Sequence, residues 1–426
     1  MDHFQYAQGR LHAEAVPIEA IAEAVGTPFY CYSSATLERH FKAFETAFAD
    51  MAPTICFAVK SNSNIAVLRF LASLGAGADV VSGGETTRAL AAGVSADRIV
   101  YSGVGKMAEE IAAALKAGIW QINVESEPEL DTVAQVAQSL GVTATVGIRI
   151  NPDVDANTHA KISTGKAENK FGIDWMRTRE VYARAASMPN IRIVGLALHI
   201  GSQLLDLEPY RAAYSRMGQL VETLRADRQT VERLDLGGGL GIGYGPNPSQ
   251  TPADYAGVVR AALAHLGCEL TLEPGRAIAG NAGILVTRVI YVKEGATRKF
   301  AIVDAAMNDL MRPALYDAHH DIVPVAEPDA NAHLSDMDVV GPICETGDTF
   351  ATNRPLPEVK SGDLLVFRTA GAYGAVMASM YNARALPPEV LVKDDTFHVV
   401  RQRIGVADML ARESVPDWLN TEDHEV

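Results

Sequence analysis

The sequence predicts a (β/α)8 barrel followed by an antiparallel β domain, and two observations support this fold class. From about residue 54 to 276, short apolar runs rich in β-branched residues alternate with amphipathic stretches of helical periodicity. After Gly280, β-rich runs separated by Gly, Pro and Asp follow one another without intervening helices. We therefore assign residues 29–280 to the barrel and 281–426 to the β domain, and we expect residues 1–28 to pack on the β domain.

Eight apolar runs are the predicted barrel strands, and they span about 220 residues, a length that fits a closed (β/α)8 barrel. They are Thr54 to Lys60, Ala78 to Ser82, Ile99 to Gly103, Trp120 to Glu125, Thr145 to Asn151, Ile193 to Gly201, Arg233 to Gly239 and Glu269 to Gly275. The helices between them include Ile65 to Leu74, closed by Gly75, and Glu109 to Lys116, closed by Gly118. The predicted strands of the β domain are Gly283 to Glu294, Lys299 to Ala305, Asp321 to Ala326, Asp363 to Ala370 and Val390 to Val400.

Composition narrows the functional classes. The 426 residues are 48% hydrophobic and carry a net charge of −15 without a basic cluster, which favours a globular metabolic enzyme over a protein that binds nucleic acid or an anionic membrane. No apolar run reaches the ~18 residues of a membrane span, and the polar N-terminus lacks a secretory pattern, so we expect a cytoplasmic protein. Four widely spaced cysteines indicate free thiols and no zinc site, and we predict no metal.

Polar residues end most of the predicted barrel strands, where the active sites of such barrels lie. Lys60 ends the first strand, and an amine at the tip of a buried strand has its pKa lowered by desolvation, which makes it a Schiff-base candidate. The alternative is a lysine that extends to solvent. The other polar ends are Ser82 to Glu85, Asn151, His199 to Ser202, Gly237 to Gly239 and Glu273 to Arg276.

The loops after the seventh and eighth predicted strands favour a phosphate site, because barrels of this kind commonly bind phosphate there. One loop is a triple glycine, whose backbone N–H groups can approach an anion, and the other contains Arg276, whose guanidinium can form a forked pair. The alternative is that the glycines serve only a tight turn. Dinucleotide, P-loop and serine-hydrolase motifs do not occur, and the His319-His320-Asp321 cluster lacks the spacing of a helical metal site.

A strand-end lysine, a phosphate site and a strand-end carboxylate together suit pyridoxal 5'-phosphate. Glu273 would keep the pyridine nitrogen protonated, and His199 would stack on the ring. The alternatives are a salt bridge between Glu273 and Arg276 and a hydrogen-bonded core histidine. A protonated ring is a deep electron sink, which is what the decarboxylation of an amino acid requires.

An ordered set of runs from about residue 25 to 400 closely resembles the diaminopimelate decarboxylase family, of the alanine-racemase-like, fold-type-III class. The runs are Phe57 to Asn62, His199 to Gln203, Leu236 to Leu240, Glu273 to Arg276, Met307 to Tyr316, Gly341 to Asp348 and Ala370 to Gly374. The resemblance implies that Lys60 binds the cofactor covalently and that Cys344 donates a proton from a second subunit of a homodimer. It implies the remaining cofactor contacts Asp79, His199, Ser202, Gly238, Gly239, Glu273, Gly275, Arg276 and Tyr373, and the substrate contacts Arg276, Arg312, Tyr316, Glu345 and Tyr373.

The implied reaction converts meso-2,6-diaminopimelate to L-lysine and carbon dioxide, the last step of lysine biosynthesis. Its substrate carries a carboxylate and an ammonium at the distal centre, which suit Arg312 with Tyr316 and Glu345, respectively. Three alternatives stay open: Arg312 and Tyr316 as a surface pair, Cys344 as a small buried hydrophobe, and a related decarboxylase acting on ornithine, arginine or carboxynorspermidine. A non-catalytic homologue that binds pyridoxal phosphate or a partner is a fourth. The stretch Ala318 to Ser335 has no assigned role.

Overall fold

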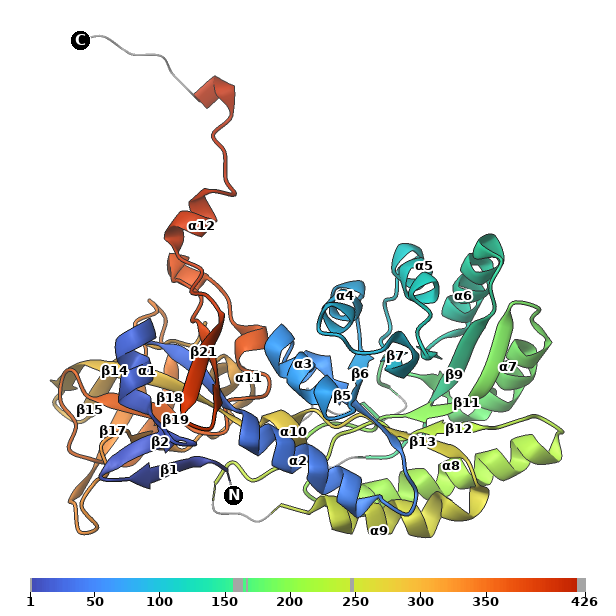
Figure 1. Ribbon diagram of the computed structural model, residues 1–426, viewed down its shortest axis with the longest axis horizontal. Helices are drawn as coiled ribbons and strands as arrows, with labels where there is room; N and C mark the ends of the chain where they lie inside the picture. Colours follow the sequence, from blue (N-terminus) through green and yellow to red (C-terminus); the bar gives the residue numbers. More distant parts are fainter. Residues whose placement is uncertain (1, 156–163, 166–167, 246–248, 420–426) are drawn as a thin grey trace.

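The computed structural model describes residues 2–155, 164–165, 168–245 and 249–419, which form a barrel and a separate sheet lying side by side (Figure 1). The chain begins at the sheet, builds the barrel, and returns to the sheet, so both ends of the sequence contribute to the second domain. In this part of the chain, no helix is both long enough and apolar enough to cross a membrane.

Eight parallel strands close the barrel, which confirms the predicted fold of this part. Each pairs with the next in the order β5-β6-β7-β8-β9-β11-β12-β13, and β13 returns to β5. Most strands stop a few residues earlier than predicted, and the polar residues beyond them form loops at the mouth of the barrel. The strands are β5 Thr54–Ala58, β6 Gly77–Val80, β7 Ile99–Tyr101, β8 Gln121–Val124, β9 Ala144–Asn151, β11 Ile191–Leu198, β12 Arg233–Asp235 and β13 Glu269–Leu272, with β10 Ile173–Asp174 beside the end of β9.

Helices cover the outside of the barrel, and local signals in the sequence set their ends. In α6, the Ser126 hydroxyl accepts the N–H of Glu129, and Gly141 ends the helix in the left-handed conformation. The predicted closing glycines Gly75 and Gly118 likewise have φ of +99° and +73°. The helices are α2 Ser34–Ala47, α3 Ile65–Ser73, α4 Gly83–Ala91, α5 Ala108–Ala117, α6 Glu127–Leu140, α7 Trp175–Ser187, α8 Glu208–Ala226, α9 Pro252–Leu263 and the short α10 Arg276–Ala279.

The second sheet is mixed, not purely antiparallel as predicted. Its order is β18-β17-β15-β14-β4-β20-β21, with β19 also paired to β14 and β16 to β19. Two pairs are parallel, β15 with β17 and β4 with β20, because long connections bring the chain back in the same direction. The strands are β4 Phe29–Ser33, β14 Gly283–Glu294, β15 Lys299–Val303, β16 Ile322–Pro324, β17 Leu334–Val340, β18 Thr349–Pro357, β19 Leu364–Phe367, β20 Glu389–Lys393 and β21 Thr396–Arg401, and α11 Arg312–Tyr316 follows β15.

Three details of the second domain differ from the prediction. Strand β4, which was counted with the barrel, lies in this sheet between β14 and β20. Strands β17 and β18 were missed, since several polar residues interrupt their apolar pattern. The run Val390 to Val400 contains most of a hairpin, β20 and β21, which turns at Asp394, a residue with φ of +54°.

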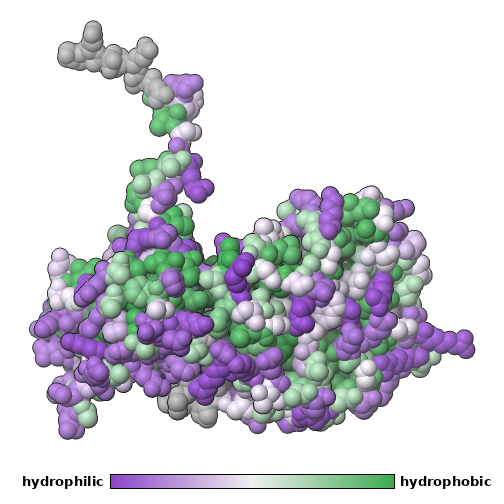
Figure 2. All heavy atoms as spheres, viewed as in Figure 1, coloured by the Kyte–Doolittle hydropathy of each residue, from purple (hydrophilic) through white to green (hydrophobic). Residues whose placement is uncertain are grey.

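The N-terminal segment packs on the second sheet, and the C-terminal segment extends away from it (Figure 1). At the N-terminus, β1 Phe4–Ala7, β2 Arg10–Ala13, β3 Val16–Pro17 and α1 Ile18–Val25 share one buried apolar cluster with β14, β19 and β20. At the other end, residues 405–419, which include α12 Val406–Leu410, leave the body as an arm (Figure 1). This C-terminal arm carries hydrophobic residues on its surface (Figure 2), and the side chains of Leu410 and Trp418 are exposed.

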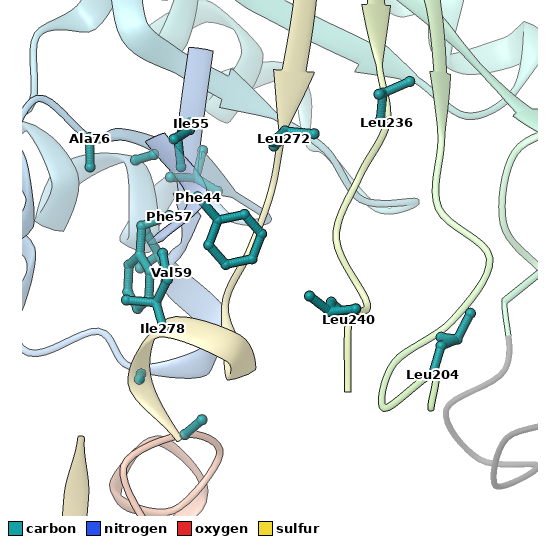
Figure 3. Close-up of a cluster of buried hydrophobic side chains, with 14 of the residues drawn as sticks. Phe44, Ile55, Phe57, Val59, Ala76, Leu204, Leu236, Leu240, Leu272 and Ile278 are labelled. Carbon is teal, nitrogen blue, oxygen red and sulfur yellow. The ribbon is translucent and has the colours of Figure 1, made fainter. Parts of the chain in front are cut away.

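An apolar cluster supports the mouth of the barrel from one side (Figure 3). Phe44 of α2, Leu272 of β13 and Leu240 beyond β12 are buried in it together with Phe57 of β5. The first three also line the pocket that contains Lys60. Since buried apolar surface stabilises a fold by roughly 25 cal/mol per Å², this wall holds the strand ends in place.

Candidate active site

Lys60 lies just beyond β5, in a tight turn formed by Val59–Ser61, and lines a pocket at the barrel mouth. Its Nζ forms an ion pair with the fully buried Asp79 of β6. Burial lowers the pKa of Lys60, but the carboxylates of Asp79 and Glu273 outweigh burial, so that the pKa is raised. The predicted lowering is therefore wrong, because the sequence did not reveal that two carboxylates face this amine.

The triple-glycine turn, residues 237–239, forms one wall of this pocket. A Cβ on Gly238 would lie 2.1 Å from the carbonyl oxygen of Glu273. Gly239 has a φ of +102°, and its Cβ would lie 2.3 Å from the oxygen of Gly201. The turn therefore needs glycine for close packing, and it also leaves the pocket beside Ser202 and Gly275 open.

Arg276 lies at the same end of the pocket and is 7% exposed. Its Nη2 donates to Ser202 Oγ at 3.1 Å, its guanidinium lies 4.6 Å from the ring centroid of Tyr373, and Nη1 donates to the Tyr244 hydroxyl. Among the described residues it forms no ion pair with a carboxylate, so the alternative of a salt bridge with Glu273 is wrong. A buried guanidinium without a carboxylate is costly, and this arrangement suits a bound anion.

Three carboxyl groups are buried below Lys60. Glu273 shares a hydrogen bond with Asp235, and burial together with Asp235 and Asp79 raises the pKa of Glu273. Asp235 also accepts from Asn123 Nδ2 at 2.7 Å, which fixes its orientation. Glu273 Oε1 is buried and has no hydrogen-bond partner among the described residues. Asp79 Oδ1 is likewise buried without a partner among the described residues, so the cluster offers two oxygens to donors inside the pocket.

His199 follows β11 and lines the same pocket. Its Nδ1 accepts the backbone N–H of Gly238 at 3.2 Å. Burial, with the positive charges of Arg149 and Lys60, holds the pKa of His199 well below its ordinary value. The ring is therefore neutral and fixed, as a side chain stacked on a ligand ring needs to be.

A wider chamber of about 370 Å³ adjoins Lys60 and is lined by Arg312 and Tyr316 of α11. Arg312 is 5% exposed, so it does not belong to a surface pair. Its guanidinium lies 4.5 Å from the ring centroid of Tyr244, and Nη1 contacts His320 Nε2 at 2.9 Å. Like Arg276, it forms no ion pair with a carboxylate in the described part of the chain. The chamber therefore presents a second buried cation.

Cys344 and Glu345 lie apart from these chambers. They occupy an exposed loop between β17 and β18, residues 341–348, hereafter the Cys344 loop. Neither lines the described pockets around Lys60. The Cys344 N–H donates to Asn382 Oδ1 at 3.1 Å, and the Tyr381 hydroxyl donates to Glu345 Oε2 at 3.1 Å. Cys344 is therefore not a small buried hydrophobe, and a single chain does not bring the two residues to the other predicted site residues.

Sequence reasoning missed three residues of the site. Asp235 was hidden inside a predicted strand, where a carboxylate in an apolar run was the available signal. Tyr244 follows the triple glycine but belongs to no recognised motif. His320 was weighed only as a metal ligand, and the structure instead places it against Arg312.

The residues around Lys60 fit pyridoxal phosphate. Such a group needs an amine for its aldehyde, an anion site for its phosphate and an acceptor for its protonated ring nitrogen. Lys60, the glycine turn with Arg276, and the unpartnered oxygen of Glu273 supply these three features within one pocket. The observation that carries the fit is the buried oxygen without a donor.

Comparisons with known proteins agree with this chemistry. The family model described as pyridoxal-dependent decarboxylase, pyridoxal binding domain, matches residues 34–280. The chain is 50% identical to diaminopimelate decarboxylase from Pseudomonas fluorescens, over 97% of this chain and 99% of that one, and 48% identical to the Haemophilus influenzae protein of that name, over 97% and 100%. A crystal structure of diaminopimelate decarboxylase from M. jannaschii in co-complex with L-lysine superposes with a TM-score of 0.94 at 36% identity, covering 98% of this chain and 99% of that one.

These matches extend over both domains and not over the barrel alone. Their identities lie well above the level at which only a fold is shared, and the fold is the alanine-racemase-like one that the resemblance implied. The chain belongs to the diaminopimelate decarboxylase family of pyridoxal-dependent carboxy-lyases.

Proposed function

We propose that this chain decarboxylates meso-2,6-diaminopimelate to L-lysine with pyridoxal phosphate as cofactor, in the last step of lysine biosynthesis. The observation that carries the proposal is Arg312, a buried guanidinium without a carboxylate partner among the described residues, in the chamber next to Lys60. A substrate with a second carboxylate gives this cation its anion. An ornithine-type substrate has only one carboxylate and leaves Arg312 unpaired.

Residues of the barrel mouth hold the cofactor. Lys60 binds its aldehyde carbon through Nζ, and Glu273 accepts from its ring nitrogen. Ser202, Arg276 and the glycine turn would hold the phosphate, and Asp79, His199, Gly275 and Tyr373 would supply the remaining contacts. When bound, pyridoxal phosphate supplies an electron sink for the pair left by departing carbon dioxide. Burial, Asp235 and Asp79 raise the pKa of Glu273, and a cationic ring nitrogen beside Glu273 would favour the carboxylate form that accepts its hydrogen bond.

The distal centre of the substrate lies in the wider chamber. Arg312 forms a forked pair with its carboxylate, Tyr316 adds a hydroxyl, and Arg276 and Tyr373 contact the substrate as well as the cofactor. Glu345 takes the distal ammonium. These contacts hold the substrate at both ends, which fixes the orientation of the bond that breaks.

Cys344 Sγ protonates the carbon that has lost carbon dioxide. This Cys344 belongs to a second copy of the chain. The exposure of Cys344 and Glu345, and their separation from Lys60 in one chain, support a homodimer with shared sites. The apolar side chains of the C-terminal arm are a further exposed surface that a second copy can bury (Figure 2). The cytoplasmic location stays a prediction of the sequence.

Carbon dioxide release by the purified protein, with pyridoxal phosphate added, tests the proposal. We expect release from meso-diaminopimelate with an equal amount of L-lysine, and no release from L-ornithine or L-arginine run in parallel. Release only from ornithine or arginine would move Arg312 out of the substrate site. Silence on all three substrates would favour a binding protein.

A further inference from the structure

Two buried guanidiniums share one aromatic ring in this site. The Arg276 and Arg312 guanidiniums lie 5.8 Å and 4.5 Å from the ring centroid of Tyr244. Two cations this close repel each other, and burial together with Arg276 lowers the pKa of Arg312. The electron-rich face of Tyr244 offsets part of that repulsion. Tyr244 therefore stabilises both cations.

His320 fixes the other side of Arg312. It is 2% exposed, and its Nδ1 lies 2.9 Å from the carbonyl oxygen of Arg368 while its Nε2 lies 2.9 Å from Arg312 Nη1. A carbonyl oxygen only accepts, so Nδ1 carries the proton and Nε2 offers its lone pair to the guanidinium. Burial and the adjacent Arg312 lower the pKa of His320 to about 3, so this acceptor persists at neutral pH.

The ring of His320 also meets Tyr244 edge-on, with ring centroids 5.4 Å apart. The three side chains thus form one unit, hereafter the Arg312 clamp: Tyr244, Arg312 and His320. Arg312 Nε has no partner among the described residues, and only Nη1 is held by His320, so part of the guanidinium stays available to a ligand.

We infer that Tyr244 and His320 are positioning residues that orient Arg312 as a receptor for a second carboxylate and thereby determine the preference for a dicarboxylate substrate. This inference rests on the proposed function, because it takes Arg312 as the distal-carboxylate site. His320 does not line the chamber, and Tyr244 lines it beside Arg312. Their substitution therefore changes the affinity for the carboxylate end of a ligand and leaves affinity for its amine end unchanged.

Two substitutions of His320 separate its two hydrogen bonds. Asparagine places its amide near the position of Nδ1, so H320N keeps donation to the Arg368 carbonyl and loses the acceptor for Arg312. Glutamine reaches the position of Nε2, so H320Q keeps the acceptor and loses the other contact. A purely structural histidine predicts that both variants behave alike, or that H320Q is the worse of the two.

The test is equilibrium binding to the full-length enzyme loaded with pyridoxal phosphate. The two ligands are L-lysine, which keeps the distal carboxylate, and 1,5-diaminopentane, which lacks it. We expect H320N to weaken L-lysine binding about tenfold, as for a lost hydrogen bond to a charged group, and to change diaminopentane binding less than about twofold. H320Q should stay within about threefold of the wild type for both ligands.

Two further variants keep the test decisive. Y244L removes the ring and should weaken L-lysine selectively, whereas Y244F keeps the ring and should show a smaller loss, that of the hydroxyl that accepts from Arg276. R312A distinguishes the proposed role of Arg312 from the proposed role of Tyr244 and His320. If R312A leaves L-lysine binding unchanged, the proposed role of Arg312 fails; if R312A weakens it and neither H320N nor Y244L does, the clamp inference alone is overturned.

Discussion

The proposed site residues at the barrel mouth are buried within one chain, whereas those of the Cys344 loop, residues 341–348, are exposed. At the mouth, Lys60, Glu273 and Arg276 are enclosed by side chains from neighbouring strand ends, and their partners are fixed. Cys344 and Glu345 instead lie on an exposed loop. Cys344 forms a hydrogen bond with Asn382, and Glu345 forms one with Tyr381. The first region is organised to bind ligands, and the second is organised to be presented outward.

This difference shows how the chemistry is divided within the chain. The groups proposed to bind the cofactor and a carboxylate line buried pockets to which both domains contribute, and burial strengthens the interactions of each charge there. The proposed proton donor and ammonium acceptor lie on an exposed loop of the second domain, and the proposed homodimer would bring them to the site. Substitutions in the two regions test this difference.

Replacing Lys60 with Ala removes the amine at the centre of the barrel mouth. Turnover of diaminopimelate should fall by about 10³-fold or more, since a covalent catalyst has no substitute in the pocket. Steady-state carbon dioxide release measures the loss, and Lys42→Ala, at an exposed ion pair on α2, is the matched control. Near-normal turnover in Lys60→Ala would end the covalent role.

Mixing two inactive variants tests whether the regions meet across subunits. Lys60→Ala lacks the barrel amine, and Cys344→Ala lacks the loop thiol. Random reassembly of an isologous dimer places both intact residues in one site of each mixed dimer, so activity should recover to about a quarter of the wild type. Unfolding and refolding the variants together, followed by activity measurement, gives the answer. No recovery, with mixed dimers demonstrated by mass, would show that each site belongs to one chain.

Replacing Arg312 with Ala tests the side of the substrate chamber that α11 contributes. The value of kcat/KM for diaminopimelate should fall by about 100-fold or more, because truncating one partner of a buried charge pair costs about 2–5 kcal/mol. Arg312→Lys should recover part of the loss, as a point charge without the fork. An unchanged kcat/KM would refute the placement, and Arg211→Ala, at an exposed pair, controls for loss of charge.

Asp309 of the second domain should make the free energy of unfolding depend on pH. This carboxyl belongs to the segment between β15 and α11 and is buried, and burial raises its pKa to about 7. The unfolded value is about 3.9, so the folded state binds more protons between these limits and stability falls as pH rises through them. From pH 5 to 8, the wild type should lose about 2–3 kcal/mol of unfolding free energy relative to Asp309→Asn. Urea unfolding at both pH values measures it, and parallel curves for the two proteins would contradict it.

Much of the barrel was predictable because its signals are local. Strands buried on both faces appear as apolar runs, and their polar ends mark the mouth, so Lys60, His199 and Glu273 were found together. The pKa direction of Lys60 was not predictable, since it depends on Asp79, a residue brought close only by strand pairing. Position in the chain also misled the assignment of β4, which pairs with strands more than 250 residues away.

The Arg312 clamp could be predicted only in part from the sequence. Arg312 and Tyr316 could be named because they lie in one recognisable run. Tyr244 and His320 come from two different loops, and only the folded chain places them on either side of one guanidinium. Contacts between loops depend on the fold as a whole, and no local periodicity encodes them.

The smallest expected effect belongs to Tyr381, which supports the exposed region. Its hydroxyl donates to Glu345 Oε2 at 3.1 Å, so Tyr381→Phe removes one of the contacts that orient the proposed ammonium acceptor. A hydrogen bond to a charged group contributes about 1–2 kcal/mol at most positions, so KM for diaminopimelate should rise about fivefold while kcat stays within about twofold. Tyr291→Phe, at an exposed tyrosine of β14, is the control. A fall in kcat without a change in KM would place Tyr381 with Cys344 and the proton instead of with Glu345 and the ammonium.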